Sequence, residues 1–79
     1  MTNKEFNAHI TAQIEALRAK KWELEKKKNI ALDVALWEEN AGMRAIHDKR
    51  VTQYGRAAAR IAQRIEALKS RYILGEAFN

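Results

Sequence analysis

Apolar side chains recur along most of this chain at the spacing of amphipathic helices. In the second half, steps of three and four residues alternate without a break over three heptads, through Val51, Tyr54, Ala58, Ile61, Ile65, Leu68 and Tyr72. The first half has a similar stripe, formed by Phe6, Ile10, Ile14, Leu17, Leu24, Ala31 and Ala35. Such spacing places each set on one face of a helix. The pattern therefore predicts two long helices with coiled-coil-like packing.

Capping and turn residues set the predicted helix ends. Thr2 and Glu5 have the spacing of a capping box, which marks a helix start. Asn40-Ala41-Gly42 is the best turn, because asparagine caps helices and glycine permits positive φ. Gly75 is well placed to end the second helix. We expect one domain over residues 1–79, with helix 1 over 3–39, a turn at 40–42, helix 2 over 43–74 and a short tail at 75–79.

A turn near residue 41 predicts the register of the two stripes. Facing residues then have numbers that sum to about 82. The expected pairs are Ala31 with Val51, Leu24 with Ala58, Leu17 with Ile65, Ile14 with Leu68, and Ile10 with Tyr72. Lys21 and Lys28 interrupt the first stripe, and we expect them to bury their stems opposite Ile61 and Tyr54 while their ammonium groups reach water. Phe6 should approach Leu74 and Phe78.

The predicted fold class is thus all-α, an antiparallel helical hairpin. A bend near Asn29, after three consecutive lysines, is an alternative that gives three helices. A second alternative is one continuous helix that pairs with another chain through the same residues.

The segment from residue 30 to 46 is apolar on more sides than one partner helix can cover. We expect it to form an oligomer, as in a four-helix bundle of two hairpins, or to dock another protein. The predicted docking residues are Ile30, Leu32, Val34, Leu36, Trp37, Met43 and Ile46. Self-association is the favoured choice, because a small hairpin seldom supplies enough core by itself.

The net charge of +5 comes entirely from the second half. Residues 1–40 carry seven basic and seven acidic side chains, whereas residues 41–79 carry eight basic and three acidic ones. Arginine predominates in the second half, and its guanidinium suits contact with carboxylate or phosphate. In the expected register, one flank of the hairpin gathers cations from both helices. The predicted basic contact face comprises Lys20, Lys27, Arg50, Arg56, Arg60, Arg64 and Arg71.

No catalytic, cofactor or metal site is predicted. The chain has no cysteine, which excludes disulfides and thiolate ligands and is consistent with a cytoplasmic protein. His9 and His47 lie far apart in the hairpin register, and Glu38 and Glu39 have no helical Glu-x-x-His partner. The glycines are isolated, so no phosphate-binding loop exists. No apolar run is long enough to cross a membrane, and the narrow stripe of the second helix suits a coiled coil better than a membrane surface.

Function must be inferred from shape and charge, because the sequence carries no motif of a known family. We expect a non-enzymatic regulator or inhibitor that self-associates and occupies the surface of a protein partner, and the basic face is compatible with a partner whose surface is acidic. The alternative is nucleic-acid binding through the basic ridge of the second helix, formed by Arg56, Arg60, Arg64 and their neighbours. Trp22 and Trp37 could stack on bases in that case, but are expected to act as buried anchors.

Overall fold

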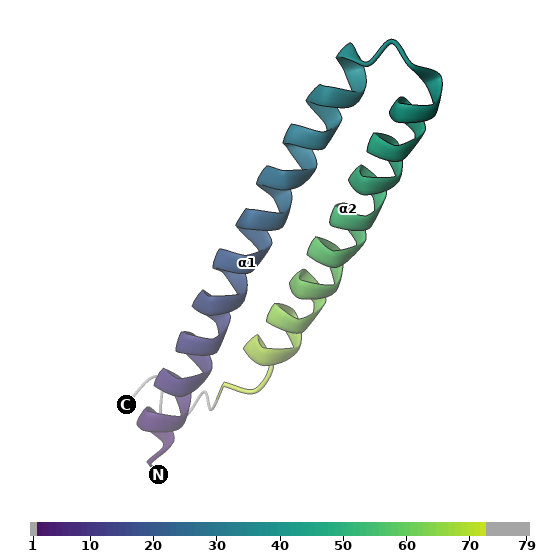
Figure 1. Ribbon diagram of the computed structural model, residues 1–79. Helices are drawn as coiled ribbons and strands as arrows, with labels where there is room; N and C mark the ends of the chain where they lie inside the picture. The colour runs from purple at the N-terminus through teal and green to yellow at the C-terminus, as the bar shows by residue number, and fades with distance from the viewer. Residues whose placement is uncertain (1, 73–79) are drawn as a thin grey trace.

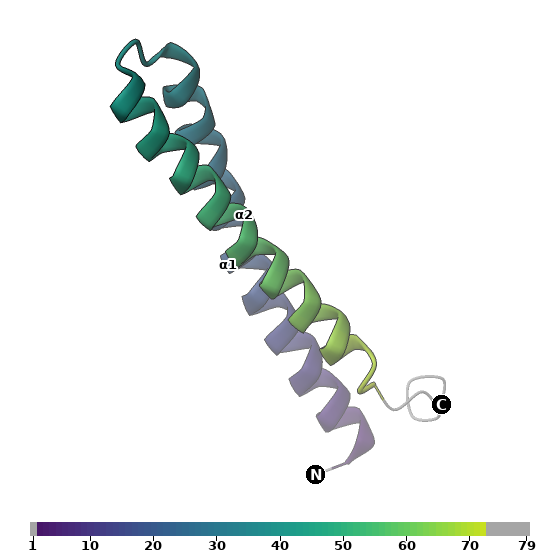
Figure 2. The ribbon, with the colours of Figure 1, turned by 90° about the vertical axis from the view of Figure 1, so that its right-hand side faces the viewer.

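The computed structural model describes residues 2–72 and consists of two antiparallel helices (Figure 1). Helix α1 spans Asn3–Trp37 and helix α2 spans Ala41–Lys69. They pack side by side along their length as an elongated hairpin with extents of 59 × 17 × 14 Å (Figure 2). The predicted all-α hairpin is confirmed, and neither the bend near Asn29 nor a single continuous helix occurs.

The start of α1 is a capping box, as predicted. The Glu5 backbone N–H donates to Thr2 Oγ1 at 3.1 Å, and the Thr2 N–H donates to Glu5 Oε2 at 3.4 Å. Two backbone donors at the helix start thereby gain partners.

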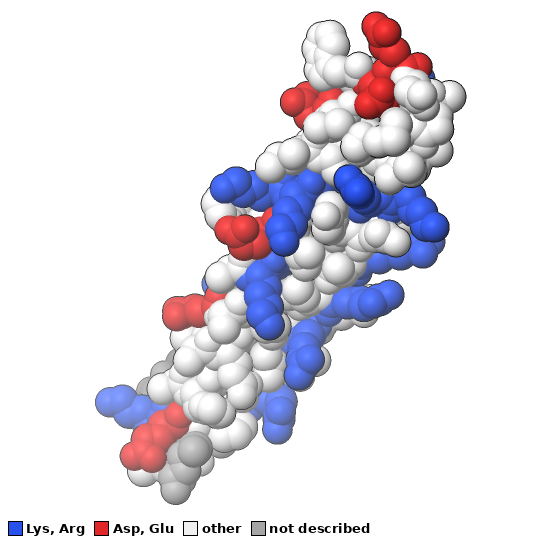
Figure 3. Space-filling view, in the orientation of Figure 1, with Lys and Arg blue, Asp and Glu red and all other residues white. Residues whose placement is uncertain are grey.

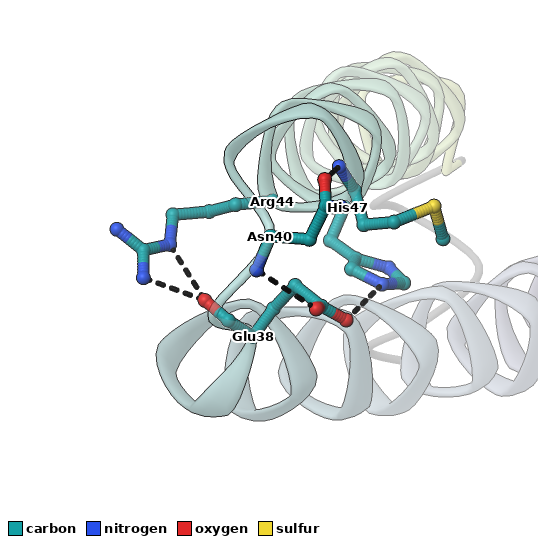
Figure 4. A network of polar contacts seen from close by, with 5 residues as sticks. Glu38, Asn40, Arg44 and His47 are labelled. Carbon is teal, nitrogen blue, oxygen red and sulfur yellow. Dashed lines mark hydrogen bonds and ion pairs between the residues drawn. The ribbon is translucent and has the colours of Figure 1, made fainter.

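The turn occupies residues 38–40, two residues earlier than predicted. Asn40 caps α2, because its Oδ1 accepts the Met43 N–H at 3.1 Å. Glu38 holds the other side of the turn: its carboxylate accepts the Asn40 N–H at 3.1 Å and lies 3.9 Å from His47 Nε2. Its carbonyl accepts two hydrogen bonds from Arg44 (Figure 4). Gly42 lies inside α2, and no residue among 2–72 has a positive φ, so side-chain capping makes this turn and glycine does not.

Helix α2 ends at Lys69, earlier than the predicted residue 74. Ser70 forms the cap: its N–H donates to the Glu66 carbonyl, and its hydroxyl donates to the Ala67 carbonyl at 2.7 Å. A serine hydroxyl that donates a hydrogen bond to a backbone carbonyl in this way competes with the backbone hydrogen bonds that would continue the helix. The predicted roles of Gly75, Leu74 and Phe78 lie outside the described residues.

The contacts between the helices agree with the predicted register. Ile10, Ile14, Ile65 and Leu68 form the buried core cluster at the open end of the hairpin, with Phe6, Leu17, Ile61 and Tyr72 packed against it. Across the same end, the Thr11 and Tyr72 hydroxyls lie 2.8 Å apart. Towards the turn, the buried interface residues are Ala31, Ala35 and Ala58. The core is therefore bulky at the open end and thin near the turn.

Gly55 gives a direct test of the packing in the middle of α2. A β-carbon at this position would lie 3.9 Å from Lys28 Cδ, an ordinary van der Waals contact. Because glycine costs a helix interior about 1 kcal/mol relative to alanine, Gly55→Ala is expected to stabilise the hairpin by about that amount. Thermal unfolding followed by circular dichroism measures the gain as a rise of several degrees in Tm.

Gly42→Ala is the matched control for this substitution. A β-carbon there would lie 3.2 Å from Asn40 Oδ1, the atom that caps α2, so we expect a smaller gain than at Gly55. A loss of stability in Gly55→Ala would contradict the placement of the Lys28 stem against α2.

Candidate functional site

Eight large apolar side chains of the described residues are exposed, and most of them lie near the turn. Because alanines form the interface there, the larger side chains point away from the partner helix. Trp37 is 82% exposed and Leu36 is 72% exposed. The other six are Trp22, Ile30, Leu32, Val34, Met43 and Ile46. All seven predicted docking residues are thus exposed in the hairpin. The expectation that Trp22 and Trp37 are buried anchors is wrong for this hairpin.

These apolar residues do not form one surface. Helical residues two positions apart point about 200° apart, so Leu32 and Leu36 lie on the opposite side of α1 from Val34. Ile30 and Val34 line the same groove as Lys27 and Arg50, and Ile30 also borders a hollow on α1 with Trp22 and Glu25. Leu32 and Leu36 do not line that groove. The single patch expected over residues 30–46 is therefore divided between the two sides of the hairpin, because the segment is continuous in sequence but helical in shape.

One side of the hairpin, here called the basic side, carries three successive grooves edged by cations of both helices. Lys20, Arg64 and Arg71 line the groove at the open end. Lys20 and Lys27 line the middle groove, and Lys27 and Arg50 line the groove near the turn. This brings together five of the seven residues predicted for the basic contact face. Figure 3 shows a face of the molecule on which Lys and Arg lie over both helices.

The cations of the basic side have few acidic neighbours. Among residues 2–72, none of the five takes part in an ion pair. Glu23 is the one carboxylate among the described residues that line the three grooves on this side. The side thus carries a concentrated positive charge, which attracts anionic groups at long range.

The opposite side, here called the mixed side, carries charges of both signs. Its groove is lined by Arg18, Lys21, Trp22, Glu25, Ala62, Ile65, Glu66 and Lys69. Lys21 Nζ lies 3.5 Å from Glu25 Oε1, and Lys69 Nζ lies 3.3 Å from Glu66 Oε1. Leu32 and Leu36 continue this side towards the turn, since Leu32 follows Glu25 by one heptad and Leu36 follows Leu32 by one helical turn.

The remaining predicted residues of the basic face lie elsewhere. Arg56 and Arg60 are exposed on α2 but line none of the grooves described above.

Trp22 is a surface residue that the sequence analysis did not predict, although its position next to Lys21 places it one residue off the apolar stripe. Its ring lies on the mixed side, with Lys26 Nζ 5.1 Å from the ring centroid.

The His, Asp and Glu side chains of the described residues do not gather into one site. His9 contacts Gln13 at 3.1 Å, and His47 lies beside Glu38 in the turn. Within residues 2–72 no three His, Asp or Glu side chains come close enough together to hold a metal ion. In this part of the chain, neither helix has the length of apolar sequence that a membrane crossing requires.

The chain as a whole was compared with protein-family models, curated proteins and solved structures, and none of the three gives a significant match.

Proposed function

We propose that this protein is a non-enzymatic interaction protein, a self-associating hairpin that regulates or inhibits a protein partner by covering part of its surface. The observation that carries the proposal is the distribution of apolar residues. Seven apolar side chains are buried among the described residues, and three of these are alanines. Eight large ones are exposed. A chain of this size with so thin a core gains stability by covering such residues in an assembly.

The mixed side is the proposed self-association surface. It carries Trp22, Leu32 and Leu36, and four of the five charged side chains that line its groove form ion pairs within the chain. Two hairpins that pack through this side form a four-helix bundle with two-fold symmetry. Pairing through the basic side is disfavoured, because a two-fold axis would bring its unpaired cations together.

Light scattering after size exclusion tests this proposal, at about 0.1 M and about 0.5 M NaCl and with fluorescent DNA and RNA duplexes in parallel. We expect an oligomer whose mass is the same at both salt concentrations, because apolar contacts resist screening, and which does not migrate with either duplex. A monomer that carries a duplex at low salt and releases it at high salt would instead support nucleic-acid binding through the basic face.

A further inference from the structure

The basic side combines an apolar floor with charged edges along the length of the hairpin. Leu17 and Leu68 lie in the groove between Lys20, Arg64 and Arg71. Further along, Leu24 and Ile61 lie beside Lys20 and Lys27. A series of grooves with such a floor, here called the groove, suits a helix that has an apolar stripe, whereas the backbone of a nucleic acid offers phosphates and sugars but no apolar stripe.

The cations along the groove are spaced by heptads. Lys20 and Lys27 are seven residues apart on α1, and Arg50 and Arg64 are fourteen residues apart on α2, while Arg71 follows Arg64 by seven residues just beyond the end of α2. Seven residues of helix advance about 10.5 Å. A helix lying in the groove advances by the same distance per heptad. Its carboxylates, if they recur every seven residues, can therefore meet successive cations.

The end of the groove near the turn is apolar. Ile30 and Val34 line it beside Lys27 and Arg50. Trp37 follows Ile30 by seven residues, which places it near Ile30 on α1 but beyond the residues that line the groove. On α2, Met43 precedes Arg50 by seven residues, and Ile46 precedes it by one helical turn. A ligand of this side therefore meets apolar side chains at one end and cations over the remainder.

A second copy of this chain does not have the complementary pattern. No two acidic residues within either helix are seven or fourteen positions apart. The acidic side chains of α1 are also interspersed with lysines. The occupant must therefore be a different molecule, with more regularly placed carboxylates.

We propose that the basic side binds an acidic amphipathic helix of another protein, whose carboxylates recur at heptad spacing on either side of an apolar stripe. This rests on the proposed function and names the class of partner. The apolar stripe packs on the floor of the groove, and the carboxylates pair with Lys20, Lys27, Arg50, Arg64 and Arg71. Charge attraction speeds the encounter, and the apolar end near Trp37 slows dissociation.

A synthetic helical peptide tests the proposal. The probe is a fluorescent peptide of about three heptads, with leucine at the first and fourth and glutamate at the fifth and seventh heptad positions. Its binding to the intact protein is followed by fluorescence anisotropy at about 0.1 M NaCl, beside a peptide with lysine in place of each glutamate. We expect the acidic peptide to bind and the lysine peptide not to bind.

Two charge-reversal variants then locate the site. Lys20→Glu with Arg64→Glu removes two cations from the groove, and should weaken peptide binding by about tenfold or more. Lys4→Glu with Lys49→Glu makes the same change in charge on exposed residues, one on each helix, that line none of the grooves, and should change the affinity by less than about twofold. Trp37→Asp should weaken peptide binding and leave the mass of the oligomer unchanged.

The possible failures are distinguishable by measuring the mass of every variant. An intact oligomer that ignores the acidic peptide would overturn this inference and leave self-association standing. Equal losses in the two charge-reversal variants would overturn the groove as the site. Tighter binding of a DNA or RNA duplex than of the peptide, lost in Lys20→Glu with Arg64→Glu, would replace the helix with a nucleic acid. A monomeric protein would contradict the proposed function itself, whatever the peptide does.

Discussion

Leu32→Asp is expected to dissociate the oligomer, while Val34→Asp leaves it intact. On the proposed model of assembly, Leu32 is buried between two copies, and an aspartate there would place an unpaired charge in each half of a symmetric interface. We expect the dissociation constant to rise by about a hundredfold or more, which corresponds to about 2.7 kcal/mol. Sedimentation velocity over a range of protein concentrations measures the change.

Val34 is a closely matched control for Leu32. The two side chains are 42% and 44% exposed in the hairpin, and both lie on α1 two residues apart. The change to aspartate costs the isolated helix a few tenths of a kcal/mol more at Leu32, because leucine has the higher helix propensity, and this difference is small beside the expected effect on assembly. The two residues lie on different sides of α1: Val34 lines a groove of the basic side, and Leu32 does not. Dissociation by both variants, or by Val34→Asp alone, would contradict the assignment of self-association to the mixed side.

Ile14→Ala should have the largest effect on folding. Ile14 is 3% exposed and belongs to the cluster that supplies most of the bulky core. Removing its outer carbons should reduce the free energy of unfolding by about 2–4 kcal/mol. For a hairpin with so few buried side chains, that loss is a large part of the total stability. Urea unfolding followed by circular dichroism, at one fixed protein concentration, measures it.

Ile30→Ala makes the same chemical change at a side chain that is 57% exposed. We expect it to cost less than about 0.5 kcal/mol, apart from the small difference in helix propensity, because little of Ile30 is buried in the hairpin. Similar losses in the two variants would mean that the core does not lie at the open end.

The parts of the fold that depend on local pattern were predictable from the sequence. The alternating steps from Val51 to Tyr72 gave the interface of α2, and the spacing of Thr2 and Glu5 gave the start of α1. Even Lys28, which interrupts the apolar stripe, has its stem against α2, at Gly55 and thus one residue from the predicted Tyr54. Each of these features follows from helical spacing or from one side-chain hydrogen bond.

The exact ends of the helices were less predictable, because several residues near each end can cap or terminate a helix. Gly42 suggested a turn with positive φ, but Asn40 caps α2 from outside the helix and leaves Gly42 within it. Ser70 likewise ends α2 before Gly75. In both places a side-chain oxygen that bonds to the backbone determines where the helix begins or ends.

The helical spacing in the sequence already implies that the apolar side chains of residues 30–46 point to different sides of the hairpin. Treating the segment as a single patch hides this division. Helical geometry separates Leu32 and Leu36 from Val34, and the same geometry places Ile30 and Val34 beside Lys27 and Arg50. The gathering of Lys20, Lys27, Arg50, Arg64 and Arg71 was predicted correctly, because it required only the antiparallel register. Trp22 is exposed because it lies one residue from the apolar stripe, whereas its residue type alone favours a buried anchor.

The central claim is that self-association covers one side of the hairpin and leaves the other open. The chain has no cysteine, so Leu32→Cys and Val34→Cys each introduce a single thiol whose rate of labelling reports its exposure. As the protein concentration rises and the oligomer forms, labelling of Leu32→Cys should slow by about tenfold or more, while labelling of Val34→Cys should not change. Equal slowing at both positions, or slowing at residue 34 alone, would contradict the account.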